Sequence, residues 1–375
     1  MSIATSRSDR TPGPAAELGG LLPSATEPVG RWSAAVRSRV LGELEVFLDC
    51  NRIGPVHGIA VDDIARQYIG GGKCLRSTFM YLGWLCGAAP EAAAVRAAAG
   101  LELLHAFALL QDDVMDAAEV RRGEPAAHIR FTARHRRIRM PSAAARFGES
   151  AATLLADICL VWAEKMLRES GITRDALDRV WPRYDAMRVE LALGQFADLL
   201  NDARTEPELG AVLAVARAKS GNYTVRRPLE LGAAMAGCDD GVFAALSRYG
   251  HMVGEAFQLR DDILGVFGTT AVTGKTSDSD LGQHKATTVV VAARRLADSA
   301  AGRELTELLS APDIDATAVE RLRTLIAATG ARDYIERMIT DRVAQARRIT
   351  GAASLPESQR RLLDGMAGIC TIRET

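Results

Sequence analysis

Three aspartates and two arginines stand close together at the end of an apolar stretch. Residues 103–128 read LLHAFALLQDDVMDAAEVRRGEPAAH, with Asp112, Asp113 and Asp116 in the middle and Arg121 and Arg122 a few residues later. Carboxylates this close repel one another, so we expect a cation between them. The guanidinium group of arginine binds anionic oxygens well, because it can donate two parallel hydrogen bonds. The segment therefore predicts a site that joins a cation to an anionic group.

The spacing of the first and third aspartates suits a shared cation. No Pro or Gly interrupts LELLHAFALLQDDVMD, so we expect one helix there. Asp112 and Asp116 then lie about 40° apart around the axis, one turn along. Carboxylate oxygens suit Mg²⁺, whose coordination is usually completed by water and substrate phosphates rather than by protein alone. This predicts a phosphorylated substrate.

A second aspartate pair follows about 150 residues later. The stretch FQLRDDILGVFG ends another apolar helix with Asp261 and Asp262. One acidic helix end is often only a solvated surface feature. Two of them facing across a cavity would hold several Mg²⁺ ions around one diphosphate.

Basic residues near these stretches can balance a diphosphate. GGGKCLRS places Lys73 and Arg76 after a glycine turn, where a helix N-terminus also favours anions. It is not a nucleotide-binding P-loop, because Gln67 and Cys74 stand where that motif requires Gly and Ser or Thr. A single basic residue is more often a solvated surface charge. The case that these residues bind a diphosphate therefore rests on their placement near the motifs. The further candidates are Arg121, Arg122, Lys219, Lys275 and Lys285.

Composition limits the class of protein. The chain has 375 residues, of which 48% are hydrophobic and 25% charged, and a formal net charge of -1. These values are typical of a globular protein, and the near-zero net charge gives no support for nucleic-acid binding. The six cysteines form no C-x-x-C pair, which indicates a reducing compartment and no zinc site. Since no apolar run suggests a membrane span or a signal peptide, we expect a cytoplasmic protein.

The periodicity of the chain indicates helices throughout. From Arg31 onward, apolar residues recur at spacings of three and four, and alternating strand patterns are absent. We therefore expect one large all-α domain over residues 31–375. Residues 1–30 are rich in Ser, Thr, Pro and Gly and are expected to be a flexible segment.

The order of these motifs resembles the trans-isoprenyl diphosphate synthase family, whose members make geranyl, farnesyl and geranylgeranyl diphosphates. The likeness runs from GGGKCLRS to LGQHKATTVV and includes DDVMD with RRG, GQFADL, KSGNYT, FQLRDDILGVFG and AVTGKTSDSDLGQHK. It implies a homodimer and a helical bundle of the isoprenoid synthase type with a central cavity. It also implies Mg²⁺-dependent head-to-tail condensation of isopentenyl diphosphate with dimethylallyl, geranyl or farnesyl diphosphate.

The resemblance also assigns roles to residues. It implies that three Mg²⁺ ions are bound by Asp112, Asp116 and Asp261, with Asp113 and Asp262 in support. The allylic diphosphate would be neutralised by Arg121, Lys219, Lys275 and Lys285. Isopentenyl diphosphate would lie against Lys73, Arg76, His105 and Arg122. Gln258 and Ser220 would lie near the reacting carbons.

Some positions depart from the family pattern. Gly265 stands where the second motif often has its third aspartate, and Ser77, Ser220 and Gln111 replace a common Pro, Thr and His. The position of Lys285 can shift by one residue relative to some relatives. The change at Gly265 leaves a non-catalytic partner subunit as an alternative.

Product length is expected to depend on the residues below the first aspartates. Phe107 lies five residues before Asp112, about 7.5 Å along a helix, and small Ala108 lies next to it. In the family, this arrangement resembles the pattern of geranylgeranyl diphosphate synthases. We therefore expect a C20 product, with farnesyl diphosphate as the alternative. The other interpretation of Phe107 is ordinary core packing.

A class I terpene cyclase is the nearest different enzyme. Its second metal motif, N-x-x-x-[ST]-x-x-x-E, is approached by Asn201 and Thr205, but Leu209 occupies the glutamate position. A cyclase would also leave Lys73 and Arg76 without a second substrate to bind.

Overall fold

The computed structural model describes residues 21, 27–138, 144–202, 208–268, 279–282, 285–311 and 314–372. Most of the segment expected to be flexible lies outside these residues, as do Lys275 and Thr205.

The chain folds as an all-α protein, as the periodicity predicts. Its helices are α1 (Val29–Cys50), α2 (Val61–Ile69), α3 (Leu75–Leu85), α4 (Ala92–Met115), α5 (Ala127–Ile138), α6 (Ala144–Arg168), α7 (Arg174–Asp202), α8 (Leu209–Ala216), η3 (Arg217–Arg226), α9 (Arg227–Ala236), α10 (Asp240–Phe267), α12 (Ser279–Gly282), α13 (Thr288–Leu296), α14 (Ser299–Leu309), α15 (Ala316–Ala328), α16 (Ala331–Ala352) and α17 (Glu357–Thr371).

Among the described residues, two very short hairpins interrupt the helices. Strand β1 (Pro55–Val56) pairs antiparallel with β2 (Ile59–Ala60), and β3 (Val120–Arg121) pairs antiparallel with β4 (Glu124–Pro125). The second hairpin follows α4 directly and contains Arg121, so it turns this arginine back toward the helix end. Strands of two residues are too short to leave an alternating pattern in the sequence.

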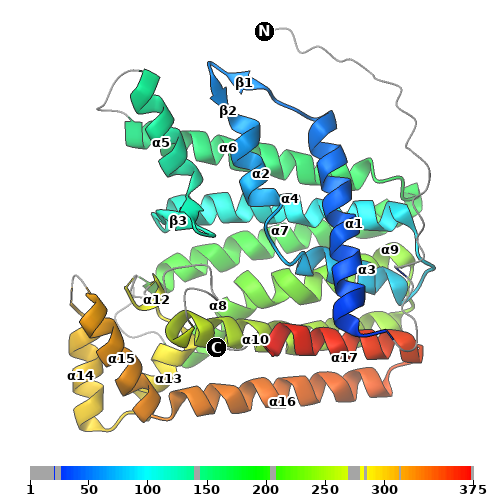
Figure 1. The fold of residues 1–375 in the computed structure, drawn as a ribbon. Coiled ribbons are helices and arrows are strands. Elements are labelled where there is room, and N and C mark those ends of the chain that lie inside the picture. Colours follow the sequence, from blue (N-terminus) through cyan, green and yellow to red (C-terminus); the bar gives the residue numbers. More distant parts are fainter. Residues whose placement is uncertain are drawn as a thin grey trace.

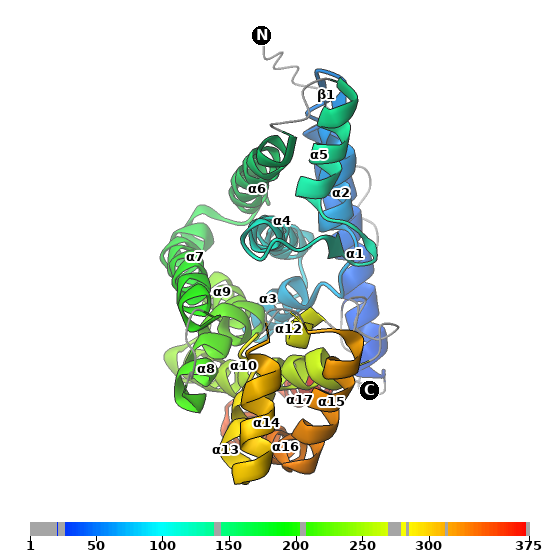
Figure 2. The same ribbon diagram turned by 90° about the vertical axis from the view of Figure 1, so that its left-hand side faces the viewer.

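Helix α4 is the central helix of the larger hydrophobic core. Figures 1 and 2 show α4 with α6 and α7 on one side and α1 and α2 on the other. Its buried residues face in many directions, as expected for a helix surrounded by others. In the part of the chain that is described, α4 alone has the length and apolar composition of a membrane span. However, 67% of that window is buried inside the protein.

Helix α1 covers the core with one regular stripe. Its buried residues recur every four positions, at Trp32, Val36, Val40, Leu44 and Leu48. The stripe packs against α3, α4 and α17. Because the helix begins at Val29, regular structure starts two residues before the expected boundary at residue 31.

Helix α10 joins two hydrophobic clusters. Its first half contributes Leu246 and Tyr249 to the larger core, and its second half contributes Leu259 and Ile263 to a smaller cluster. Residues of α13, α15 and α16 complete the smaller cluster. The C-terminal half of α10, which carries the second aspartate pair, is therefore fixed on both sides.

Candidate active site

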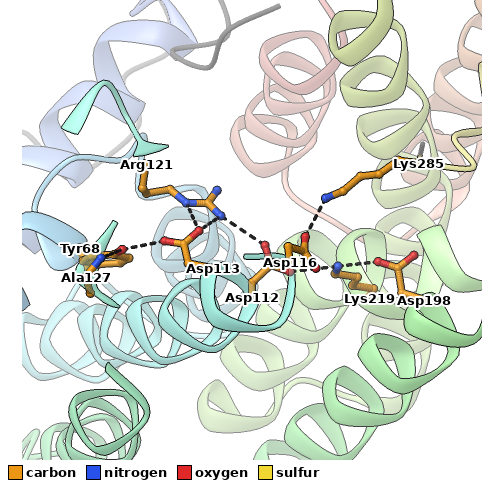
Figure 3. A network of polar contacts seen from close by, with 9 residues as sticks. All are labelled: Tyr68, Asp112, Asp113, Asp116, Arg121, Ala127, Asp198, Lys219 and Lys285. Atoms are coloured by element: carbon orange, nitrogen blue, oxygen red, sulfur yellow. Dashed lines mark hydrogen bonds and ion pairs between the residues drawn. The ribbon is translucent and has the colours of Figure 1, made fainter. Parts of the chain in front are cut away.

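Asp112 lies on the last turn of α4 and Asp116 caps the C-terminus of this helix, one turn further along as the spacing predicts. The helix ends at Met115, and the backbone N–H of Asp116 donates to the carbonyl of Asp112 at 2.8 Å. Figure 3 shows both carboxylates beside Lys285 and Lys219, which come from other parts of the chain. The Lys285 Nζ lies 2.7 Å from Oδ2 of Asp116.

Asp112 is held between two cationic side chains. The Lys219 Nζ donates to its Oδ1 at 3.1 Å, and Nη2 of Arg121 donates to its Oδ2 at 3.3 Å. Burial alone would raise the pKa of Asp112, but the charges of Lys219, Arg121 and Lys285 outweigh it and hold this pKa below its usual range. The carboxylate is therefore ionised, as a cation ligand must be.

Asp113 is directed into the protein rather than toward a ligand. The Tyr68 hydroxyl donates to its Oδ2 at 2.6 Å, and Nε of Arg121 donates to its Oδ1 at 2.8 Å. The Tyr68 oxygen in turn accepts from the Ala127 N–H at 2.9 Å. Since Asp113 is fully buried and both its oxygens are engaged, it serves to aim Arg121.

Lys219 reaches Asp112 from a π-helix. The wider turns of η3 present Lys219 next to Gly194 of α7, where an added Cβ would lie 2.8 Å from the Lys219 backbone nitrogen. Asp198, one turn further along α7, accepts a second hydrogen bond from Lys219 at 2.6 Å. Burial lowers the pKa of Lys219, but Asp112 and Asp198 raise it above its usual value.

Asp198 is a site residue that the sequence prediction missed. It belongs to GQFADL, which was recognised as a motif without a role being given to its aspartate. The signal was present in the sequence, because Gly194 and Asp198 are four residues apart and so share a helix face.

The second aspartate pair approaches the first through residues 285–288. Asp262 is buried and accepts from Thr288 Oγ1 at 2.6 Å, from the Thr288 N–H at 2.9 Å and from Gln258 Nε2 at 2.8 Å. Lys285, three residues before Thr288, makes the ion pair with Asp116. Asp261 precedes Asp262 on α10 and is partly exposed.

A pocket of about 830 Å³ extends from Asp112 between α4, α6, α7 and η3, with Leu160 as the residue of α6 in its wall. The predicted residues that line it are Arg76, His105, Phe107, Ala108, Asp112, Lys219 and Ser220. The described site residues outside this lining are Lys73, Asp113, Asp116, Arg121, Arg122, Gln258, Asp261, Asp262 and Lys285. The pocket therefore has a charged end at Asp112 and apolar walls below it.

A second group of donors lies in the pocket wall. The Arg76 guanidinium stacks 4.4 Å from the centre of the Tyr223 ring, and Arg76 Nε and His105 Nδ1 are buried without a hydrogen-bond partner among the described residues. Burial, assisted by the charges of Arg76 and Arg122, holds the pKa of His105 well below its usual value. A neutral histidine and a guanidinium with an unpaired N–H can both donate to an anion.

The glycines before Arg76 make room for Arg122. A Cβ at Gly71 would lie 2.6 Å from Nη1 of Arg122, which also donates to the Tyr68 carbonyl at 3.4 Å. The missing side chain thus lets the guanidinium lie against the loop of Gly70 to Gly72.

The acidic residues have the oxygen donors that Mg²⁺ requires. Among the described residues, however, no three His, Cys, Asp or Glu side chains are placed to hold an ion by themselves. This fits a cation that keeps waters and is completed by substrate phosphate oxygens. Asp112 and Asp116, one turn apart, have carboxylate oxygens that could bind such a cation.

Together, the helical bundle, the aspartates at the end of the core helix, the surrounding cations and the apolar pocket define a prenyl diphosphate synthase type of site. The model of the polyprenyl synthetase family matches residues 60–326, so the chain belongs to this family and is a prenyltransferase.

Individual relatives agree with this assignment. Over 291 residues the chain is 33% identical to a geranylgeranyl diphosphate synthase of Mycobacterium tuberculosis, covering 77% of this chain and 76% of the relative. It is 32% identical to a geranylfarnesyl diphosphate synthase of Aeropyrum pernix, covering 74% and 83%. The fold matches a Corynebacterium glutamicum geranylgeranyl pyrophosphate synthase, crystallised with isoprenyl diphosphate and magnesium, with a TM-score of 0.85 and 30% identity over 93% of this chain and 100% of that one.

Proposed function

We propose that the protein condenses isopentenyl diphosphate with allylic diphosphates and releases geranylgeranyl diphosphate, a C20 product. The observation that best supports this function is that Asp112 lies at one end of an apolar pocket whose wall contains Phe107. Relatives named for two different products match almost equally well, so identity alone does not set the product length. We propose a C20 limit because Phe107, five residues before Asp112 on α4, lines the pocket at a position that resembles the aromatic position of geranylgeranyl diphosphate synthases.

Asp112, Asp116 and Asp261 are the proposed magnesium ligands, and three ions are expected. Bound Mg²⁺ would neutralise the diphosphate as negative charge develops on it. Arg121, Lys219 and Lys285 donate to the same group. Because aspartates already hold these side chains in place, they need little rearrangement when the carbon–oxygen bond of the allylic substrate breaks. Lys275 is expected to assist, but it lies outside the described residues.

Isopentenyl diphosphate is proposed to bind Lys73, Arg76, Arg122 and His105. Its double bond then attacks the allylic cation, and a proton leaves to the departing pyrophosphate. No side-chain nucleophile is needed. Asp113 and Asp262 are proposed to support the site indirectly, since both carboxylates are buried and accept hydrogen bonds from other residues of the protein. Ser220 lines the pocket, where the reacting carbons are proposed to lie. The Gln258 amide instead donates a hydrogen bond to Asp262.

A second copy of the chain is proposed to cover the exposed apolar side chains of α6 and α7, two of which, Val189 and Phe196, also line the pocket. This apolar face, which we define by its exposed side chains, consists of Leu154, Val161, Val189, Leu193, Phe196 and Leu200. The four residues on α7 recur at i, i+4, i+7 and i+11, the spacing of a helix–helix seam. An exposed apolar stripe of this kind marks an association surface.

The proposed function is tested by incubating the protein with labelled isopentenyl diphosphate, Mg²⁺ and each allylic primer in turn. We expect condensation with a C20 end product, and Phe107→Ala should lengthen it. A hydrocarbon formed from farnesyl diphosphate alone would indicate a cyclase. No consumption of isopentenyl diphosphate with any primer would favour a non-catalytic partner subunit.

A further inference from the structure

The pocket has a second charged end, far from the aspartates of α4. Along α7 its lining extends from Asp185 to Leu199. Asp198, which binds Lys219, marks the diphosphate end of this helix. Arg188 lies ten residues earlier, about 15 Å along the axis. Between these levels the wall is mostly apolar: it includes Leu160, Leu191 and Ala192, and one polar residue, Gln195.

Arg188 is held firmly at its position. Its guanidinium donates to Glu164 of α6 and to Asp185 of α7, and it lies 4.6 Å from the centre of the Tyr184 ring. Only 25% of its side chain is exposed. Burial lowers the pKa of Arg188, but the bonds to Asp185 and Glu164 raise it above the usual value, so the group stays charged.

We propose that Arg188, fixed by Glu164, is the charged end-stop that limits how far a growing prenyl chain extends between α6 and α7. This rests on the proposed function. A hydrocarbon gains free energy while it buries apolar surface along the pocket. Beyond Leu160 and Leu191 it would instead strip water from a guanidinium and two carboxylates, which is unfavourable unless these ions keep their partners.

The end-stop acts after Phe107. Phe107 lies about 7.5 Å from Asp112 along α4, whereas Arg188 lies about 15 Å from Asp198 along α7. Both line the same pocket. Removal of the phenylalanine ring therefore lets the chain grow until it meets Arg188, and the charge of Arg188 sets the next limit.

The test compares product lengths in the Phe107→Ala background, where the chain reaches the far end. Adding Arg188→Leu should raise the ratio of longer to shorter products severalfold, because an apolar side chain of similar reach replaces the charge. Adding Arg188→Lys should leave the ratio as in Phe107→Ala alone. The matched control is Arg183→Leu, on the same helix but outside the pocket, with its guanidinium 4.8 Å from the Phe243 ring.

A second variant covers the case in which Arg188→Leu does not fold. Glu164→Gln keeps the volume but weakens the tether of Arg188, so it should move the ratio in the same direction by a smaller factor. An unchanged ratio in the folded variants overturns the end-stop. By contrast, absence of condensation in the wild-type protein overturns the proposed function itself, so the two failures are distinct.

Discussion

Asp112 is a partly buried carboxylate that remains charged because cationic side chains surround it. Lys219 and Arg121 contact it directly, and Lys285 acts from the neighbouring Asp116. Residue type and helical spacing were enough to predict that Asp112 and Asp116 lie one turn apart and can share a cation. The partners Tyr68 and Asp198 were not predicted, because helical periodicity describes one helix at a time and not what a distant segment brings to it.

Replacing the central carboxylate should nearly abolish turnover. Asp112→Ala removes a proposed magnesium ligand and one partner of both Lys219 and Arg121. We expect kcat to fall by about 100-fold or more, equivalent to about 2.7 kcal/mol or more of transition-state stabilisation. The control is Asp63→Ala, at an exposed position of α2, which should leave steady-state kinetics unchanged. Equal activity in both variants would contradict the role of Asp112.

The buried His105 should make the ligand-free protein less stable in mild acid. Its pKa is depressed in the folded state, so below the unfolded value of about 6.5 the unfolded chain binds more protons. The free energy of unfolding should therefore fall as pH decreases below about 6.5, with a limiting slope of about 1.4 kcal/mol per pH unit from this residue.

Denaturant titrations at several pH values measure this slope. His105→Gln should show a flatter dependence between about pH 6.5 and 5, whatever its absolute stability. An identical slope in both proteins would mean that folding does not lower the pKa of His105.

At the scale of elements, close backbone approach decides where the charged residues lie. Gly194 allows η3 to bring Lys219 against α7, and Gly71 allows Arg122 to lie against its loop. The sequence predicted a helix around Gly194 and a glycine turn at Gly71. The sequence did not predict the π-helix, because the composition of residues 217–226 does not distinguish a π-helix from an ordinary α-helix.

Adding one methyl group at Gly71 should move Arg122. Because the nearest atoms belong to the flexible Arg122 side chain, Gly71→Ala should fold normally. We expect KM for isopentenyl diphosphate to rise severalfold, with a smaller change in kcat. Gly70→Ala is the matched control, since its Cβ would meet only the Arg66 carbonyl, at an ordinary distance of 3.6 Å. A KM that is the same in both variants would remove Arg122 from the proposed binding site.

At the scale of the whole molecule, we propose that residues 31–375 form one domain, because α10 contributes to both hydrophobic clusters. The all-α class followed from periodicity alone. The site did not, since it depends on contacts between α4, η3 and residues 285–288 that are far apart in the chain. Only the family resemblance indicated that these segments belong together.

A charge in the apolar face of α6 and α7 should separate the two copies. Leu193 is 64% exposed at the centre of the α7 stripe, so Leu193→Asp should halve the mass measured by light scattering while the helical circular dichroism is retained. Leu296, 45% exposed on α13, supplies the control substitution Leu296→Asp. If the wild-type protein is monomeric at micromolar concentration, the proposed interface is wrong.

The central claim is that two aspartate segments bind one magnesium-bridged diphosphate. Calorimetric titration of the wild-type protein with inorganic pyrophosphate tests it directly. We expect binding that requires Mg²⁺ and is lost in both Asp112→Ala and Asp261→Ala. Wild-type affinity in Asp261→Ala, or equal binding with and without Mg²⁺, would contradict the account.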